Sequence, residues 1–387
     1  MPPPDAAHLR RDLVDTLDDL HVLHTPGWRN AFLDIPREAF LPRFFRPVNG
    51  RHEAVDHDHP EWLNLVYRNA VWPTQLDGDS TAWDRARRDG PIAGEPTCSS
   101  TMPSLMALML ESLDVTDNHT VLEIGSGTGY NAALLAHRLG HDHVTSVDID
   151  PDLVDTARHQ LAATGYRPTL ITADGAGGHP DRAPYDRLIA TCSIPAIPPA
   201  WLTQVRPGGK LITHLYRDLG GGALIQLTVD SPGIAHGHFL ADYGTFMPTR
   251  LFIRTTTTDL FRRAVHQDGD TRPVTLDPGL SVADDSQPFV LLAALHMPGT
   301  HRLEFQPNDA GPQLWLLHPD GSWAVHDIDT HTVEQGGRQR LWDAVEDIYH
   351  RWTAAGKPAR ERFGLMIAAD QEWIWLDEPA EQTTGAV

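Results

Sequence analysis

The chain has 387 residues, 41% of them hydrophobic and 21% charged, which is enough for two or three domains with sizeable cores. Its 31 basic and 52 acidic residues give a formal net charge of −21, which argues against nucleic acid as a general partner because a phosphate backbone attracts a basic surface. Two cysteines, Cys98 and Cys192, are too few for a disulfide framework. No apolar run follows a basic start, and none reaches the length of about 18 residues that a transmembrane helix needs. We therefore expect a cytoplasmic protein.

The N-terminal part begins with leucines at three- and four-residue spacing over residues 5–24, which predict an amphipathic helix ended by Pro26 and Gly27. A short apolar turn between two prolines follows at 34–45. Residues 47–96 are rich in His, Asp, Pro and Gly, and we interpret them as an irregular, solvated insertion. Within them, HEAVDHDHP (52–60) lacks the ligand spacing of a metal site, so no metal is implied.

From residue 97 the pattern becomes regular. Helices are predicted at 102–113, 131–140 and 151–165, and short buried strands at 119–124, 143–149, 169–174 and 185–192. A short helix, a Pro-Gly-Gly turn and another strand follow over 201–215. Strands that alternate with helices of this length predict a parallel α/β sheet with right-handed crossovers.

Beyond about residue 250 the composition changes, and six of the eleven tryptophans follow residue 300. Residues 312–328 read as a hairpin with Asp320 and Gly321 in its turn, 337–356 as a helix and 364–378 as a second hairpin. We therefore divide the chain into four parts. These are an N-terminal helical approach segment with a polar insertion (1–96), a Rossmann-like core (97–249), an additional C-terminal α+β domain (250–380) and a loose tail (381–387).

A glycine-rich turn joins the first buried strand to the next helix in VLEIGSGTGYNAALLA (121–136). Gly125, Gly127 and Gly129 let the backbone approach a ligand closely and leave the helix N-terminus open to a polar group. Sites for NAD and FAD share a Gly-x-Gly pattern, but here the spacing is Gly-x-Gly-x-Gly, preceded by Glu123.

Acidic residues end the next two predicted strands. Asp148 stands where a carboxylate can take both hydroxyls of a ribose, and Asp174, before Gly175, can reach an adenine amino group. Nothing in this set is reserved for a pyrophosphate. The combination predicts a site for S-adenosylmethionine in a Rossmann-like class I methyltransferase domain.

With these residues in place, the chain resembles the protein-L-isoaspartate O-methyltransferases over about residues 8–215. Besides the glycine-rich segment, the resemblance is carried by IPREAFLP (35–42), TCSS (97–100), SVDIDPDLVDTAR (146–158), TADG (172–175) and APYDRLIATCSIPAIPPAWLTQVRPGGKL (183–211). Two features depart from that family: Pro103 is shifted in TCSSTMPSL, and the chain adds the insertion and the region beyond 250. This layout resembles the methyltransferases of ATP-grasp peptide maturase (graspetide) systems.

The second resemblance implies a substrate and a product. Such an enzyme methylates an L-aspartate side chain of a ribosomally synthesised precursor peptide, already crosslinked through esters by an ATP-grasp ligase, and the methyl ester then cyclises to an aspartimide (succinimide). Three alternatives stay open. The first is a protein-L-isoaspartate O-methyltransferase that repairs damaged proteins, and the second is a non-catalytic module that binds S-adenosylmethionine or a peptide. The third is a small-molecule methyltransferase, which the approach segment at 35–42 disfavours.

Methyl transfer to a carboxylate needs no catalytic His or Cys, because the carboxylate is already ionised at neutral pH. The resemblance implies that the Ser99 hydroxyl lies between donor and acceptor and contacts the substrate carboxylate; alternatively, Ser99 caps the helix that begins near Met102. The predicted cofactor-binding residues are Thr97, Cys98, Ser99, Glu123, Gly125, Ser126, Gly127, Gly129, Asp148, Ile149, Asp174 and Gly175. A basic patch of Arg37, Arg43 and Arg46 could receive an acidic peptide at the entrance, unless these arginines are simply solvated.

Overall fold

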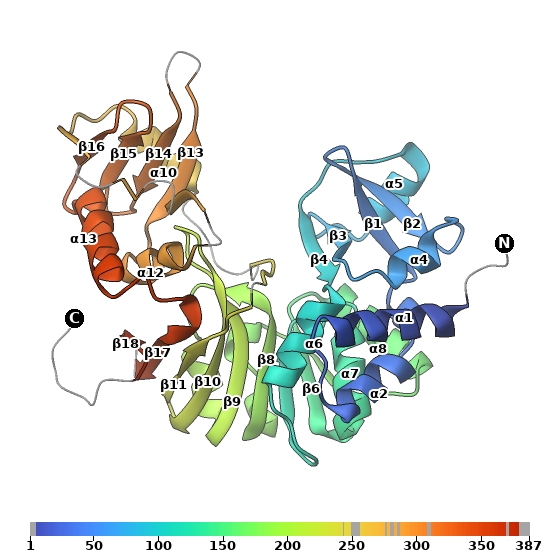
Figure 1. Cartoon of the computed structure of the whole chain (residues 1–387). Helices are drawn as coiled ribbons and strands as arrows, with labels where there is room; N and C mark the ends of the chain where they lie inside the picture. Colours follow the sequence, from blue (N-terminus) through green and yellow to red (C-terminus); the bar gives the residue numbers. More distant parts are fainter. Residues whose placement is uncertain are drawn as a thin grey trace.

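The computed structural model describes residues 5–242, 244–248, 256–274, 277–278, 282–284, 287–307, 311–368 and 371–378. Within these ranges the protein consists of a central α/β body and two lobes that rise from the same end of its sheet, on opposite sides (Figure 1). One lobe is formed by residues 43–100 and the other by strands and helices between residues 256 and 362. No helix in the described part of the chain is long and apolar enough to cross a membrane.

The central sheet has nine strands in the order β18-β17-β11-β10-β9-β8-β5-β6-β7. Five strands are parallel, as predicted: β5 (Val121–Ile124), β6 (Val144–Asp148), β7 (Thr169–Thr172), β8 (Tyr185–Ile194) and β9 (Val205–Leu215). Every residue of β5 is buried, which is typical of a central parallel strand covered on both faces. Four antiparallel strands extend the sheet: β10 (Ala223–Ser231), β11 (Ile234–Phe239), β17 (Phe363–Ala368) and β18 (Gln371–Leu376).

The helices of the body cover this sheet. They are α1 (Ala6–Asp19), α2 (Pro26–Asp34), α3 (Arg37–Phe40), α6 (Pro103–Ser112), α7 (Tyr130–Leu139), α8 (Pro151–Ala163) and α9 (Pro199–Gln204), with the short turns η1 (His141–His143), η2 (Gly175–Gly177) and η3 (Pro180–Arg182). The prediction that Pro26 ends the first helix is wrong. That helix ends at Asp19, and Pro26 instead begins α2, where the missing N–H of a first-turn proline costs no hydrogen bond.

Residues 47–96 are not an irregular insertion, and this prediction is also corrected. The segment contains β1 (Arg43–Val48), β2 (Arg51–Asp56), α4 (Trp62–Val66), β3 (Trp72–Leu76), α5 (Ala82–Asp89) and β4 (Pro96–Ser100). Its β1–β2 turn is an Asn-Gly pair, Asn49 and Gly50, with positive φ at both residues. A small core formed by Phe45, Ala54, Leu76, Ala82 and Ala86 holds the lobe together.

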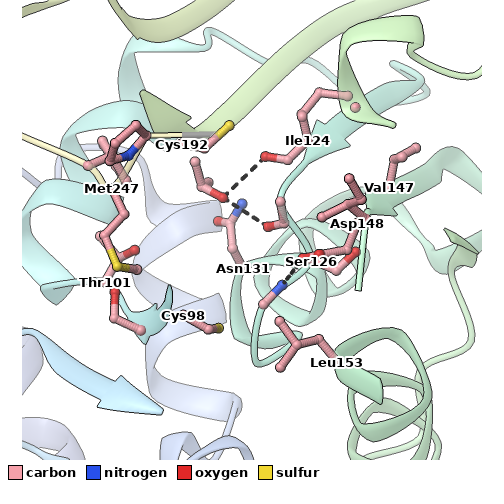
Figure 2. A pocket seen from close by; sticks show the side chains of 18 of the residues that line it. Cys98, Thr101, Ile124, Ser126, Asn131, Val147, Asp148, Leu153, Cys192 and Met247 are labelled. Carbon is pink, nitrogen blue, oxygen red and sulfur yellow. Dashed lines mark hydrogen bonds between the residues drawn. The ribbon is translucent and has the colours of Figure 1, made fainter. Parts of the chain in front are cut away.

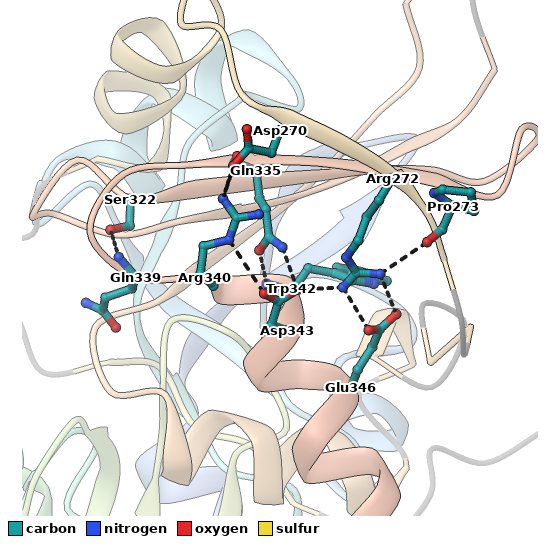
Figure 3. Close-up of polar contacts among 10 residues, drawn as sticks. All are labelled: Asp270, Arg272, Pro273, Ser322, Gln335, Gln339, Arg340, Trp342, Asp343 and Glu346. Atoms are coloured by element: carbon teal, nitrogen blue, oxygen red, sulfur yellow. Dashed lines mark hydrogen bonds and ion pairs between the residues drawn. The ribbon is translucent and has the colours of Figure 1, made fainter.

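The C-terminal lobe is built on a five-stranded antiparallel sheet. Its order is β12 (Asp270–Pro273), β16 (Thr332–Gly336), β15 (Trp323–Asp327), β14 (Gln313–Leu317) and β13 (His301–Phe305), with α10 (Thr257–Ala264), α12 (Pro288–His296), α13 (Leu341–Ala354) and η4 (Arg360–Arg362). The predicted hairpin with Asp320 and Gly321 is confirmed as β14–β15. Arg272 of β12 ties the sheet to α13 through the carboxylates of Asp343 and Glu346 (Figure 3).

The last predicted hairpin exists, but the sheet pairing assigns it to the central body. Strand β17 pairs with β11, with Ala235 opposite Ile367, so residues 364–378 extend the central sheet and do not belong to the accessory lobe. A hairpin pattern predicts pairing between its own two strands and cannot indicate which third strand it joins. The domain division at residue 250 and the tail at 381–387 fall on residues outside the described ranges and stay predictions.

Candidate functional site

A cavity of about 680 Å³ lies at the carboxyl ends of the parallel strands, a size in the range of small-molecule sites. One side is formed by the glycine-rich turn and the ends of β6 and β7, and Cys98, Thr101 and Met247 face it from the other side (Figure 2). Ten predicted residues line this cavity: Thr97, Cys98, Ser99, Gly125, Ser126, Gly127, Asp148, Ile149, Asp174 and Gly175.

Hydrogen bonds between neighbouring side chains and the backbone of the glycine-rich turn fix the conformation of this turn. Gly125 has a φ of 96°, and a Cβ there would lie 2.8 Å from the Thr191 hydroxyl, which donates to the Gly125 carbonyl at 2.9 Å. Gly127, with a φ of 50°, donates its N–H to the Asp148 carboxylate at 3.0 Å. Both glycines are therefore needed for conformation, and the backbone they leave bare forms the cavity wall.

Backbone donors also fix the acidic side chains at the strand ends. The Asp148 carboxylate accepts from Asp150 N at 3.1 Å in addition to Gly127, so it is oriented before any ligand binds. Thr97 donates to Gln75 at 2.8 Å, and Gln75 in turn donates to Asp150. These hydrogen bonds connect the lobe of residues 43–100 to the loop that follows β6. Asp174 accepts from Ala176 N at 2.9 Å at the start of η2.

Two residues of the predicted cofactor-binding set, Glu123 and Gly129, are not among the residues that line the cavity, and a contact between either of them and a cofactor stays a prediction. Glu123 is fully buried and accepts from Asn131 at 2.7 Å and from Ser146 at 2.5 Å. Burial raises the pKa of its carboxyl to about 7. Through these partners it orients Asn131, which does line the cavity. Gly129 begins α7 where a Cβ would lie 3.0 Å from Ala157 of α8, so it permits helix packing.

Ser99 lies on β4, opposite Pro73 of β3, and is a half-buried residue of the cavity lining. The alternative role as a helix cap is wrong, because the N-cap residue of α6 is Met102 and Asn69 accepts from the N–H of Ser104 at 2.9 Å. No hydrogen bond to the Ser99 hydroxyl occurs among the described residues. A contact between this hydroxyl and an acceptor carboxylate stays a prediction.

The predicted basic entrance patch does not exist as a patch. Arg37 is completely buried, and its guanidinium donates to the carbonyls of residues 66, 68, 70 and 101 and to the Ser100 hydroxyl. Burial lowers its pKa to about 10, so it remains cationic at neutral pH. Arg43 is half exposed beside Asp84, and Arg46 is paired with Glu53 and Glu61. Neighbouring carboxylates thus offset both surface arginines, while Arg37 anchors the end of β4.

The sequence did not reveal the wall formed by residues 245–248. Ser193, at the end of β8, donates its N–H to the Met247 carbonyl at 2.9 Å and its hydroxyl to the Phe246 carbonyl at 2.5 Å. His214 of β9 contacts the same hydroxyl at 2.7 Å, and burial lowers the pKa of this imidazole to about 4, so it is neutral. No local motif marks these residues; only the sheet pairing brings them to the cavity.

The charged residues that line the cavity favour some classes of ligand over others. Among the described lining residues there is no Lys or Arg, while Asp148 and Asp174 are acidic. A pyrophosphate at the glycine-rich turn would meet carboxylates without a compensating cation. A ligand that carries positive charge and neutral hydroxyls suits this lining better.

The chain is similar to known proteins in sequence and in fold. A family model described as protein-L-isoaspartate(D-aspartate) O-methyltransferase matches residues 76–219. The protein-L-isoaspartate O-methyltransferase of Methanopyrus kandleri is 39% identical over 206 residues, which are 52% of this chain and 75% of that protein. The one from Staphylothermus marinus is 32% identical over 243 residues, 61% of this chain and 89% of that protein. A solved protein-L-isoaspartate O-methyltransferase structure shares the fold, with a TM-score of 0.55 and 20% identity over 95% of this chain and all of that one.

Replacing Arg37 should test how far the position of β4, which forms part of the cavity wall, depends on the Arg37 guanidinium. We expect Arg37→Met to lower the free energy of unfolding by about 3 kcal/mol or more, because four buried or partly buried carbonyls lose their donor. Arg43→Met removes a half-exposed arginine and should cost less than about 1 kcal/mol. Denaturant unfolding of both variants measures this, and equal losses would contradict the anchoring role.

Glu123→Gln should remove one component of the pH dependence of stability. The carboxyl titrates at 4.5 in the unfolded chain and near 7 when folded, so the unfolded chain loses this proton first as pH rises. The free energy of unfolding therefore falls between about pH 4.5 and 7, by up to about 3 kcal/mol. The variant should be stabilised relative to wild type at pH 8 more than at pH 4.5, with the exposed Asp155→Asn as control. A stability difference that does not change with pH would refute the assignment.

Proposed function

Because the chain belongs to the protein-L-isoaspartate O-methyltransferase family, we propose that it transfers a methyl group to a side-chain carboxylate of a protein or peptide. One observation supports this function above others: in a single cavity, a glycine-rich turn without a nearby Lys or Arg faces a second wall that contains Ser99, whose hydroxyl has no hydrogen-bond partner among the described residues. The first half suits the methyl donor and the second an acceptor. The proposed reaction needs both to lie in one enclosed space.

S-adenosylmethionine is the methyl donor, and the residues present fit it. When bound, it supplies a methyl group on a positively charged sulfur that is already activated for transfer. Asp148 would hold the ribose hydroxyls, Asp174 would accept from the adenine amino group, and the bare backbone at Gly125 and Gly127 would lie against the remainder. The acidic lining without Lys or Arg favours the cationic donor.

The protein contributes position more than acid–base chemistry. An acceptor carboxylate is ionised at neutral pH and needs no general base. The Ser99 hydroxyl can donate one hydrogen bond to it and so fix which oxygen points into the cavity. Phe246, Met247 and Pro248 line the cavity across from the glycine-rich turn and limit the access of water there. His214, neutral because of its burial, and Ser193 keep these covering residues in place.

For the substrate we propose an L-aspartate of a ribosomally synthesised peptide that an ATP-grasp ligase has already crosslinked through esters. After methylation, the backbone nitrogen of the next residue attacks the ester carbonyl, a C–N bond forms, and methanol leaves with the nitrogen's proton, giving the aspartimide. Two lobes flank the end of the sheet where the cavity lies, which offers surface for a folded, bridged peptide (Figure 1). A pre-bridged peptide would lose little entropy on binding.

Repair of isoaspartyl residues is the second candidate. Two relatives that are 39% and 32% identical to this chain carry the name protein-L-isoaspartate O-methyltransferase, which favours this candidate. A solved structure with that name aligns with 95% of this chain. The C-terminal lobe alone therefore does not separate the two substrates. A non-catalytic binding module is disfavoured because the donor and acceptor halves of the cavity are both present.

The two substrates can be compared directly. The full-length protein is incubated with S-adenosylmethionine and either an ester-bridged precursor peptide or a linear isoaspartyl peptide, and the products are followed by mass spectrometry. We expect the bridged peptide to gain a methyl group and then to fall to one water below its starting mass. Methylation of the isoaspartyl peptide alone would establish repair instead, and turnover with neither would reject methyl transfer to peptides.

Ser99→Ala should lower kcat/KM for the accepted peptide about tenfold or more, through loss of a hydrogen bond to a charged oxygen. Affinity for S-adenosylhomocysteine should change little, because Ser99 faces the acceptor. Ser231→Ala, at the far end of β10 and outside the cavity, serves as the matched control. Unchanged kinetics in Ser99→Ala would remove this residue from the acceptor site.

A further inference from the structure

A buried histidine in the C-terminal lobe has no hydrogen-bond partner. His326 lies on β15 with its side chain toward α13, the same face as Ala324, where an apolar residue would be expected. It is 0% exposed, and neither ring nitrogen has a hydrogen-bond partner among the described residues. A buried imidazole left this way is destabilising unless something binds its nitrogens.

Two potential ligands face this ring. Asp277 places a carboxylate oxygen 3.8 Å from Nε2 of His326, and its other oxygen lies 3.2 Å from Nδ1 of His331. His331 stands in the β15–β16 turn, and its carbonyl accepts from Val274 N at 2.9 Å, which brings the segment with Asp277 alongside. One ligand atom from each of the three residues lies within 4.8 Å of the others.

We propose that Asp277, His326 and His331 bind a divalent transition-metal ion of the zinc type. Ligand atoms at about 2.0–2.1 Å from a tetrahedral ion are separated by about 3.3 Å. The three ligand atoms here lie within 4.8 Å of one another, so an ion would draw them closer together. Imidazole nitrogens favour zinc, copper, nickel or iron over calcium and magnesium, which take oxygen ligands.

The site would be structural and separate from the methyltransferase cavity. Its buried side is closed by Trp342, whose ring centroid lies 4.6 Å from that of His326. Trp342 stands at the start of α13, where Figure 3 shows it beside Asp343. Its outer side is open, since the His331 side chain is 65% exposed, so an ion can enter and water can complete the coordination. The ion would fasten the segment after β12 to the β15–β16 hairpin. No motif spacing predicted it, and the expectation that no metal is bound is revised by this proposal.

Zinc binding to the full-length protein tests this site. After treatment with a chelator, calorimetric titration with Zn²⁺ should show one saturable site per chain, and zinc should raise the midpoint of thermal unfolding. Co²⁺ should give the intense visible absorption of a tetrahedral ion. Absence of saturable binding would overturn the proposal, whatever the methyltransferase assays show.

Variants assign the ligands. His331→Ala, at an exposed turn, should fold normally and bind Zn²⁺ at least tenfold more weakly, and Asp277→Asn should behave alike. The matched control is His266→Ala, an exposed histidine of the same lobe, which should bind as wild type does. Weakening by His266→Ala as large as that by His331→Ala would show non-specific surface binding and overturn the site.

Discussion

The buried guanidinium of Arg37 is the constraint on which the site most depends. Its five hydrogen bonds join the loop over residues 66–70 to the end of β4, far apart along the chain. Strand β4 pairs only with β3 and has no place in the central sheet. Besides this anchor, the small lobe's own packing and the hydrogen bonds from Thr97 to Gln75 and from Gln75 to Asp150 hold β4 near the glycine-rich turn. A buried cation is tolerated because every partner is an oxygen already fixed by the fold.

The cavity combines two halves of different origin. The donor half comes from strand ends and a glycine-rich turn, whose positions follow from parallel pairing, and the buried Glu123 orients Asn131 in it from behind. The half proposed to receive the acceptor comes from β4 and residues 245–248, each held by one buried polar cluster, at Arg37 and at the Ser193–His214 pair. Catalysis by positioning requires such rigid supports, because the reacting groups are already activated.

Sequence reasoning recovered the donor half because its signals are local: strand, glycine turn, helix and an acidic residue at the strand end. The spacing that predicted Glu123 and Gly129 gives order along the chain but not the direction of a side chain, so it did not indicate that Glu123 is buried against Asn131. It missed the fold of residues 47–96, where a few apolar residues among many charges form a core only after pairing. It missed residues 245–248 and the Asp277–His326–His331 cluster because only tertiary pairing brings these residues together.

The most direct measurement is the affinity for S-adenosylhomocysteine of the wild type and of Asp148→Ala, by titration calorimetry. The Asp148 carboxylate is held by Gly127 and Asp150 where it can take two ribose hydroxyls. The account predicts binding by the wild type and a loss of about tenfold or more in the variant. The exposed Asp152→Ala should retain wild-type affinity. Equal affinities in wild type and Asp148→Ala, or no binding at all, would contradict the assignment of this cavity to the methyl donor.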